Sequence, residues 1–126
     1  MRYFIQYRNP DRMRPYNQFK KAFRIVTNKP VEGLIGETIW LVTGTGRPRD
    51  YYLCSRFVVD RIGHQDSGAF RNYASGSKGQ NFAPQVKIDE QDWFPGLLKK
   101  CARFSLGLQR IKSEAIIRGL QKISSS

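Results

Sequence analysis

The chain has 126 residues, of which 40% are hydrophobic and 13% aromatic, and its formal net charge at pH 7 is +12. This length and composition favour one packed domain over residues 1–126 and exclude a disordered tail. No apolar run approaches the roughly 20 residues that span a bilayer, no apolar leader is visible, and two cysteines are too few for a disulfide framework, so we expect a cytoplasmic protein that is not in a membrane.

The positive charge is concentrated near the two ends of the sequence. Residues 1–30 contain eight Lys or Arg and one acidic residue, and residues 97–126 contain seven and one. Residues 31–96 are nearly neutral, with seven basic and eight acidic residues. This asymmetry indicates a polyanionic partner, most often nucleic acid and less often an anionic membrane. The alternative is a solvated basic surface that only aids solubility.

In chain order, a strand is expected first, over residues 2–8, where apolar and polar residues alternate. The Asn-Pro-Asp sequence that follows predicts a loop, and apolar residues at helical spacing predict a helix from Tyr16 to Val26. Two segments rich in β-branched and aromatic residues, 38–42 and 52–60, predict strands joined as a long hairpin.

The hairpin connection, TGTGRPRD, contains two glycines spaced as in a phosphate-binding loop. Such a loop needs a helix to begin after the glycines, so that free backbone N–H groups point at the phosphate. Here a strand follows and the lysine of a P-loop is absent, which excludes the phosphate cradle. Arg47 and Arg49 lie at the predicted turn, where both charges must face solvent or a partner.

The region after the hairpin is rich in Gly, Ser and Asn. Residues 63–85 are predicted to form one long connection, and connections of this length inside compact domains are usually functional or disordered. Its embedded aromatic residues favour a loop that docks on a partner. Residues 86–89 could form a short strand.

Two helices are expected near the end of the chain. Asp89 or Asp92 is predicted to cap a helix from about Trp93 to Cys101. Ser113 is predicted to cap a last helix whose apolar face is formed by isoleucine and leucine side chains. The end of the chain, within residues 119–126, is expected to be a frayed tail.

No catalytic constellation is visible. His64 is the single histidine, it lies between turn residues, and a Ser-His-Asp triad has no local signature. A zinc site needs about four Cys or His ligands and the chain has three. Asp89, Glu90 and Asp92 are interpreted as helix N-terminal charge and not as metal ligands. We therefore expect no metal, no cofactor and no enzymatic activity, with an enzyme of unrecognised site as the open alternative.

Binding remains, and nucleic acid requires cations for phosphates and aromatic surfaces for unstacked bases. The sequence interleaves both kinds of residue. The candidate phosphate ligands are Arg14, Lys20, Arg47, Arg49, Arg71 and Lys78. We expect the cations of both ends and of the hairpin turn to gather on a single face beside an aromatic cleft.

The segment GETIWLV (36–42), a polar hairpin and then YYLCSRFVVDRI resemble the PUA-like superfamily, which includes EVE, ASCH, YTH and SRA domains. The order of elements is similar over residues 1–110, and the sequence likeness is specific over about 28–62. The opening of the chain also resembles an uncharacterised bacterial family of this layout. Glu37 stands where the superfamily commonly has Asp. The resemblance implies an α+β fold, namely a small curved β-barrel with flanking helices.

The resemblance also implies recognition of a modified base, flipped into a pocket between the barrel and its first loop. Carried over by position, the pocket candidates are Tyr7, Asn9, Tyr16, Asn17, Asn28 and Trp40, although Trp40 in the middle of a strand is more often a core residue. The expected partner is DNA or RNA, and an associated nuclease encoded elsewhere. Two further alternatives are a domain that binds structured RNA and a module that binds an acidic protein.

Overall fold

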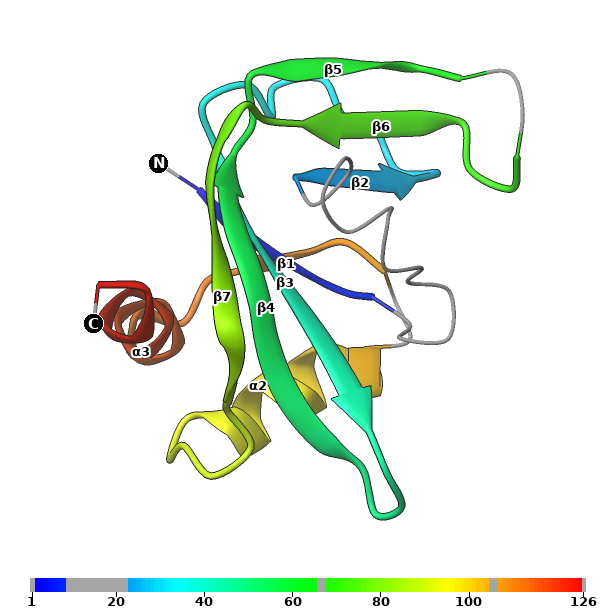
Figure 1. Cartoon of the computed structure of the whole chain (residues 1–126). Helices are drawn as coiled ribbons and strands as arrows, with labels where there is room; N and C mark the ends of the chain where they lie inside the picture. Colours follow the sequence, from blue (N-terminus) through cyan, green and yellow to red (C-terminus); the bar gives the residue numbers. More distant parts are fainter. Residues whose placement is uncertain (1, 9–22, 66–67, 105–106, 126) are drawn as a thin grey trace.

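The computed structural model describes residues 2–8, 23–65, 68–104 and 107–125 (Figure 1). The elements are, in order, β1 (Tyr3–Tyr7), β2 (Arg24–Thr27), β3 (Thr38–Thr45), β4 (Asp50–Val58), β5 (Arg61–His64), β6 (Asn72–Ser75), β7 (Lys78–Lys87), α2 (Phe94–Lys100), η2 (Ala102–Phe104), β8 (Gln109–Ile111) and α3 (Glu114–Ser124).

The strands form two sheets. The larger sheet has the order β7-β4-β3-β1-β8, and the smaller has the order β2-β6-β5. Strands β1 and β3 are parallel, and every other pair is antiparallel. The α+β class is confirmed. The described part of the chain forms these two sheets and no closed barrel.

The large sheet is the middle of three layers, because both of its faces are covered. One face carries Trp40, Val42 and Leu53, which pack with the apolar residues of α2 and α3. The other face carries Ile39 and Leu41, which pack with residues of the small sheet. In Figure 1 the small sheet lies above the large one, and the helices lie below and to its left. Burial on both faces explains why the predicted strand TIWLV reads as one continuous apolar run.

The hairpin predicted around TGTGRPRD is confirmed. Strands β3 and β4 pair from Thr38 opposite Val58 to Thr45 opposite Asp50, with an irregularity at Leu41 and Val42. A strand therefore follows the glycines, as expected.

Two expectations are wrong. The predicted helix from Tyr16 to Val26 ends in a strand, β2, and its first part lies outside the described residues. In β2 buried and half-buried side chains alternate, because Ile25 and Thr27 face the core. The long connection predicted over residues 63–85 instead contains the end of β5, all of β6 and most of β7.

Glycine composition explains the second error. A Cβ atom on Gly63 would lie 2.7 Å from the ring of Tyr73, and one on Gly79 would lie 2.8 Å from the ring of Phe23. These glycines let an aromatic ring cross a strand, so they mark close packing and not a loop. Residues 86 and 87, expected as part of a separate short strand, are the end of β7.

The two helices occur where they were predicted, with one capping error. Neither Asp89 nor Asp92 caps α2, which begins after Trp93 without a side-chain cap. Ser113 does cap α3, since its Oγ accepts a hydrogen bond from the backbone N–H of Ile116 at 3.4 Å.

The end of the chain belongs largely to α3. This helix continues to Ser124, whereas a frayed tail within residues 119–126 is expected from the sequence. Leu120 is fully buried, and Trp40 Nε1 donates a hydrogen bond to Ser124 Oγ at 3.0 Å. None of the helices in the described ranges is long and apolar enough to cross a membrane.

Candidate nucleic-acid interface

A groove of about 540 Å³ lies between α3, β8 and the start of the chain. We call it the basic groove, because its lining includes Arg2, Arg110, Lys112 and Arg118. Strand pairing creates it. Strand β8 pairs antiparallel with β1, which places Ile111 opposite Tyr3 and brings the two ends of the sequence together. In Figure 1 both chain ends lie on the left of the molecule.

The charges of the basic groove are poorly balanced. Its one carboxylate, Glu114, lies 3.6 Å from Arg118, and both side chains are about four-fifths exposed, so the pair is weak. Arg2 is held in place, because its guanidinium donates to the carbonyl of Gly33 at 2.6 Å and lies 3.9 Å from Glu37.

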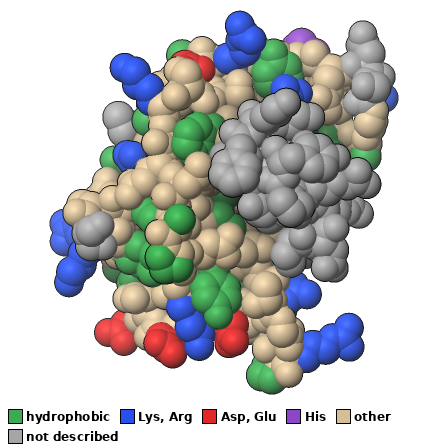
Figure 2. Space-filling view, in the orientation of Figure 1, with side chains coloured by type: hydrophobic (Ala, Val, Ile, Leu, Met, Phe, Trp, Pro, Cys, Tyr) green, Lys and Arg blue, Asp and Glu red, His purple; other side chains and the backbone are tan. Residues whose placement is uncertain are grey.

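Arg110 and Lys112 are exposed, and among the described residues neither forms an ion pair. Figure 2 shows Lys and Arg side chains projecting at the left of the view, where α3 lies in Figure 1. The groove therefore offers positive charge to a partner.

An aromatic side chain also lines the basic groove. Tyr3 is half-buried and stacks on Trp40, with 5.5 Å between ring centroids and 25° between the ring planes. Its hydroxyl accepts a hydrogen bond from Gln121 Nε2 at 3.1 Å. Tyr3 thus fixes α3 to the sheet and supplies apolar surface beside the cations.

A second hollow, of about 490 Å³, adjoins the groove along α3 and shares Arg118 with it. It is also lined by Trp93 and Lys122. The Trp93 indole packs directly on Gly119, where a Cβ atom would lie 2.1 Å from the indole nitrogen. Helix α3, with Arg118 and Lys122, therefore forms a basic ridge between two hollows. Tyr3 lines one hollow and Trp93 lines the other.

The predicted phosphate ligands lie away from this ridge or outside the described residues. Arg47 and Arg49 are exposed at the β3–β4 turn, as expected, and the Arg49 guanidinium lies 5.7 Å from the centre of the Tyr7 ring. The turn is at the lower right of Figure 1 and α3 at its left. The expectation that the cations of the turn share one face with those of both chain ends stays a prediction, because residues 9–22 lie outside the described residues.

Arg71 and Lys78 are exposed as well, in the connection before β6 and at the start of β7. They line neither hollow beside α3. Arg14 and Lys20 lie outside the described residues.

The predicted base-pocket residues also differ in where they lie, and three of them are outside the described residues. Trp40 is fully buried between the sheet and α3, so it is a core residue. Asn28 is exposed, and its amide binds the carbonyl of Ala69 at 3.3 Å and the backbone N–H of Arg71 at 3.0 Å. Asn9, Tyr16 and Asn17 lie outside the described residues.

Tyr7 is partly buried against the core. It stacks on Phe104, with 5.8 Å between ring centroids, and meets Tyr51 edge to face at 6.4 Å. Its hydroxyl donates to the carbonyl of Gly44 at 3.4 Å. Tyr7 and Arg49 together form a small cationic and aromatic site at the end of β1, next to the predicted first loop.

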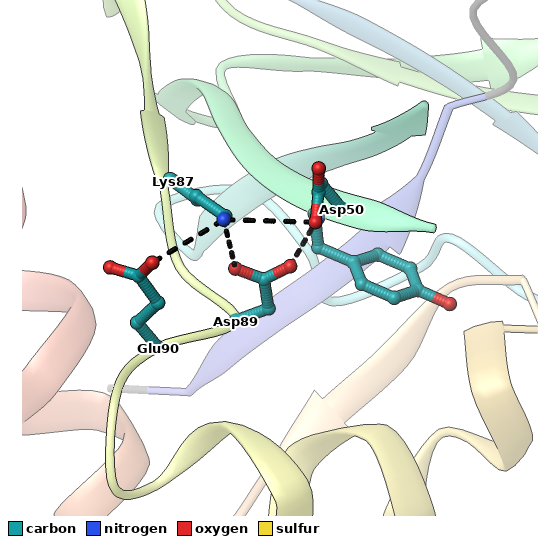
Figure 3. Close-up of polar contacts among 5 residues, drawn as sticks. Asp50, Lys87, Asp89 and Glu90 are labelled. Atoms are coloured by element: carbon teal, nitrogen blue, oxygen red, sulfur yellow. Dashed lines mark hydrogen bonds and ion pairs between the residues drawn. The ribbon is translucent and has the colours of Figure 1, made fainter. Parts of the chain in front are cut away.

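A second charged cluster has the opposite character. Lys87 Nζ lies 3.7 Å from Asp50, 3.8 Å from Asp89 and 3.3 Å from Glu90, an arrangement that we call the acidic clamp (Figure 3). Asp89 also accepts a hydrogen bond from the backbone N–H of Tyr51 at 3.1 Å. The hydrogen bond to Glu90 and the neighbouring carboxylates raise the pKa of Lys87.

The acidic clamp joins the start of β4 to the end of β7, and its lysine occupies the space between the carboxylates. This corrects the expectation that Asp89 and Glu90 supply charge to the start of α2, whose first turn contains no acidic residue. Over the described ranges no three Cys, His, Asp or Glu side chains are grouped so that they could hold a metal ion.

The nucleophile candidates lie in unreactive surroundings. Burial raises the pKa of the Cys54 thiol to about 11, against the opposing effect of the nearby Arg8. Burial likewise raises the pKa of Cys101 and lowers that of Arg8. His64 is exposed; its Nδ1 lies 2.5 Å from Asn72 Oδ1 and its Nε2 lies 3.8 Å from Glu32. Neither contact is a hydroxyl or a thiol, so within the described residues these contacts form no Ser-His or Cys-His pair.

Comparison of the chain with protein-family models, with curated proteins and with solved structures gives no match. The basic groove consequently rests on its own geometry. None of its cations was singled out from the sequence, although the surplus of seven basic residues over one acid in residues 97–126 pointed to this end of the chain. The pairing of β8 with β1, which brings Arg2 to the same place, has no local signature.

Proposed function

We propose that this chain is a non-catalytic nucleic-acid-binding domain that holds the phosphate backbone in the basic groove. One observation carries the proposal: cations from both ends of the sequence line one groove that contains a single, weakly paired carboxylate. Sequence-independent binding to nucleic acid depends on such cations, because each neutralised phosphate releases counterions.

The groove suits a backbone better than it suits an isolated ion. Four basic side chains are spread over β8, α3 and the residues just before β1 and just after β8, and the basic ridge continues to Lys122 in the adjoining hollow. A polymer with regularly spaced phosphates can contact several of these side chains at once. Tyr3 and Trp93 add surfaces on which sugars or unpaired bases can pack.

The finer proposal is that the domain reads a modified or flipped base, as its resemblance to PUA-like domains implies. Among the described candidates, the partly buried Tyr7 beside Arg49 supports this role best. An aromatic ring that stacks on an extruded base contributes about 1–3 kcal/mol. In this arrangement the basic groove supplies affinity and the Tyr7 site supplies selectivity.

The experiment for phosphate binding compares two double variants that remove the same charge. Arg110→Ala/Lys112→Ala acts on the basic groove, and Arg47→Ala/Arg49→Ala acts on the hairpin turn. Binding to a plain duplex is measured by fluorescence anisotropy at several salt concentrations. We expect the groove variant to lose roughly tenfold in affinity at 50 mM salt for each phosphate contact removed, and its log–log salt slope to flatten by about 0.9 per contact. Unchanged affinity and slope in the groove variant contradict the proposal.

The experiment for base reading uses Tyr7 alone. Tyr7→Phe keeps the ring and Tyr7→Ala removes it, and both are screened against duplexes and RNAs with different base modifications. We expect Tyr7→Phe to keep any preference that the native chain shows and Tyr7→Ala to lose it while still binding plain duplex. Equal losses for modified and plain substrates count against a pocket at Tyr7.

A further inference from the structure

A smaller pocket, of about 230 Å³, lies between α2, β8 and the first turn of α3. It is less open than the basic groove and shares Arg110, Ile111 and Lys112 with it. It is also smaller than the roughly 300–1,000 Å³ typical of pockets for drug-sized ligands. Its occupant is therefore a small molecule or a small part of a larger one.

The interior of this pocket is apolar. Leu97, Ile111 and Ile116 line it, and each is at least 95% buried. Cys101 also contributes, and burial raises the pKa of its thiol, so this side chain is uncharged at neutral pH. These core side chains therefore present a hydrophobic surface to whatever enters.

The rim of the pocket is cationic. Lys100, Arg110 and Lys112 line it, and all three are exposed. Within the described part of the chain no carboxylate lies within ion-pair distance of any of them. Lys100 ends α2, where a positive charge is favoured by the helix dipole. Three cations thus surround the entrance to an apolar interior.

We propose that this pocket binds a small amphipathic anion, such as a medium-chain carboxylate or an alkyl phosphate. The apolar body of the ligand lies against Leu97, Ile111 and Ile116, and its anionic group remains at the rim between Lys100 and Lys112. Both parts are needed. An apolar molecule leaves the three cations without a counterion, and an inorganic anion leaves the interior unfilled.

A consequence for regulation rests on the proposed function. Arg110 and Lys112 line both the pocket and the basic groove, so a bound anion neutralises charges that a nucleic acid backbone uses. Each ligand then lowers the affinity for the other by the same factor. The pocket would make nucleic-acid binding sensitive to an amphipathic metabolite.

Binding is tested first without nucleic acid, by ¹H–¹⁵N NMR titration of the full chain. Octanoate is compared with octanol, which lacks the charge, and with acetate, which lacks the apolar body. We expect octanoate to bind at least tenfold more tightly than either, with shifts concentrated at residues 97–101 and 109–116. Equal affinity for acetate and octanoate, or shifts centred elsewhere, overturn the proposal. Octyl phosphate in a parallel titration shows which anionic group is preferred.

Charge-reversal variants at exposed positions keep this test independent of folding. Lys100→Glu/Lys112→Glu is expected to weaken octanoate binding at least tenfold. Lys99→Glu/Lys122→Glu reverses two exposed lysines of α2 and α3 outside the pocket lining; it is the matched control and should change the affinity less than twofold. Identical affinities in all three proteins overturn the proposal.

Competition is measured last, with duplex DNA and the native chain. Octanoate at saturation should lower the affinity for DNA, and octanol should not. Octanoate binding without any effect on DNA removes the regulatory consequence and leaves the pocket standing. If the chain binds octanoate and no nucleic acid, the proposed function fails and the pocket does not.

Discussion

The acidic clamp and the basic groove both bring together charged side chains from segments far apart in the sequence, and they use those charges differently. In the clamp, one ammonium group lies 3.3–3.8 Å from three carboxylates, and one of these also binds a backbone N–H. In the groove, Arg2 lies 3.9 Å from Glu37 and Arg118 lies 3.6 Å from Glu114, whereas Arg110 and Lys112 form no ion pair among the described residues. The clamp satisfies its charges within the chain, whereas the groove leaves Arg110 and Lys112 for a partner.

This difference has a thermodynamic meaning. Paired charges join two strands and contribute to folding, whereas a cluster of like charges repels itself and opposes the compact state. A binding site of this kind therefore lowers the stability of the free protein and regains that free energy when an anion is bound. Changes in the clamp should therefore lower stability and leave nucleic-acid binding intact, whereas changes in the groove should lower nucleic-acid binding and leave stability intact.

The largest effect is expected where α3 is attached to the core. Leu120 is fully buried beneath the helix, and Leu120→Ala should lower the free energy of unfolding by about 2–5 kcal/mol because it leaves a cavity. Chemical denaturation measures this. Arg118→Ala, on the exposed side of the same helix, is the control and should change stability by less than about 0.5 kcal/mol. Similar values for the two variants would mean that α3 is not packed on the sheet.

A buried thiol makes the stability of the chain depend on pH. Burial raises the pKa of Cys54 from its ordinary 9.0 to about 11, so the native state keeps a proton that the unfolded chain releases. This contribution to stability is fully present below pH 9 and is lost as the pH rises to 11, by about 2–3 kcal/mol.

Cys54→Ala isolates this effect. Between pH 8.5 and 11 the variant should lose about 2–3 kcal/mol less stability than the native chain, measured by urea unfolding at each pH. Any cavity left by the substitution lowers stability equally at both pH values, so it cancels. Equal losses in the two proteins contradict a buried, neutral thiol.

Within the acidic clamp, the largest contribution is expected from Asp89. Its carboxylate accepts the hydrogen bond from the backbone N–H of Tyr51, so Asp89→Ala should lower stability by about 1.5–3 kcal/mol. Asp89→Asn keeps an acceptor oxygen and should lose less. Nucleic-acid affinity should not fall in either variant, because both make the net charge more positive. Equal destabilisation by Ala and Asn would show that the hydrogen bond is unimportant.

These regions differ in how far the sequence reveals them. The β3–β4 hairpin and the cap of α3 follow from local patterns, namely two β-branched runs around a glycine-rich turn and a serine before an apolar helical repeat. Strands β6 and β7 were not predicted, because the glycines in the neighbouring strand β5 and in β7, which make room for Tyr73 and Phe23, are typical of a loop in the sequence. The helical spacing before Val26 likewise hid β2, whose strand character depends on pairing with β6.

The position of the candidate site could not be predicted from the sequence, because it too depends on strand pairing. The basic surplus of residues 97–126 was visible, and it predicts a partner but no location. The location depends on β8, a strand of three residues whose pairing with β1 joins opposite ends of the sequence. Trp40 shows the reverse case: its position in the middle of a strand indicated a core role, and the structure confirms that its ring is fully buried.

The smallest effects are expected when one lysine is removed from each region. In this comparison the direction of the change in stability distinguishes the two regions. Lys87→Met leaves three carboxylates without their shared cation, so stability should fall. Lys112→Met removes one of several unpaired cations, so stability should stay within about 0.5 kcal/mol of native or rise, because like-charge repulsion is reduced. Both substitutions remove one positive charge and keep a long side chain, so they are matched.

The same two variants are then compared for binding to duplex DNA. Here Lys112→Met should bind more weakly than Lys87→Met, the opposite of their order in stability. If both variants lose the same stability and bind DNA with the same affinity, the acidic clamp and the basic groove do not differ in how they use their charges.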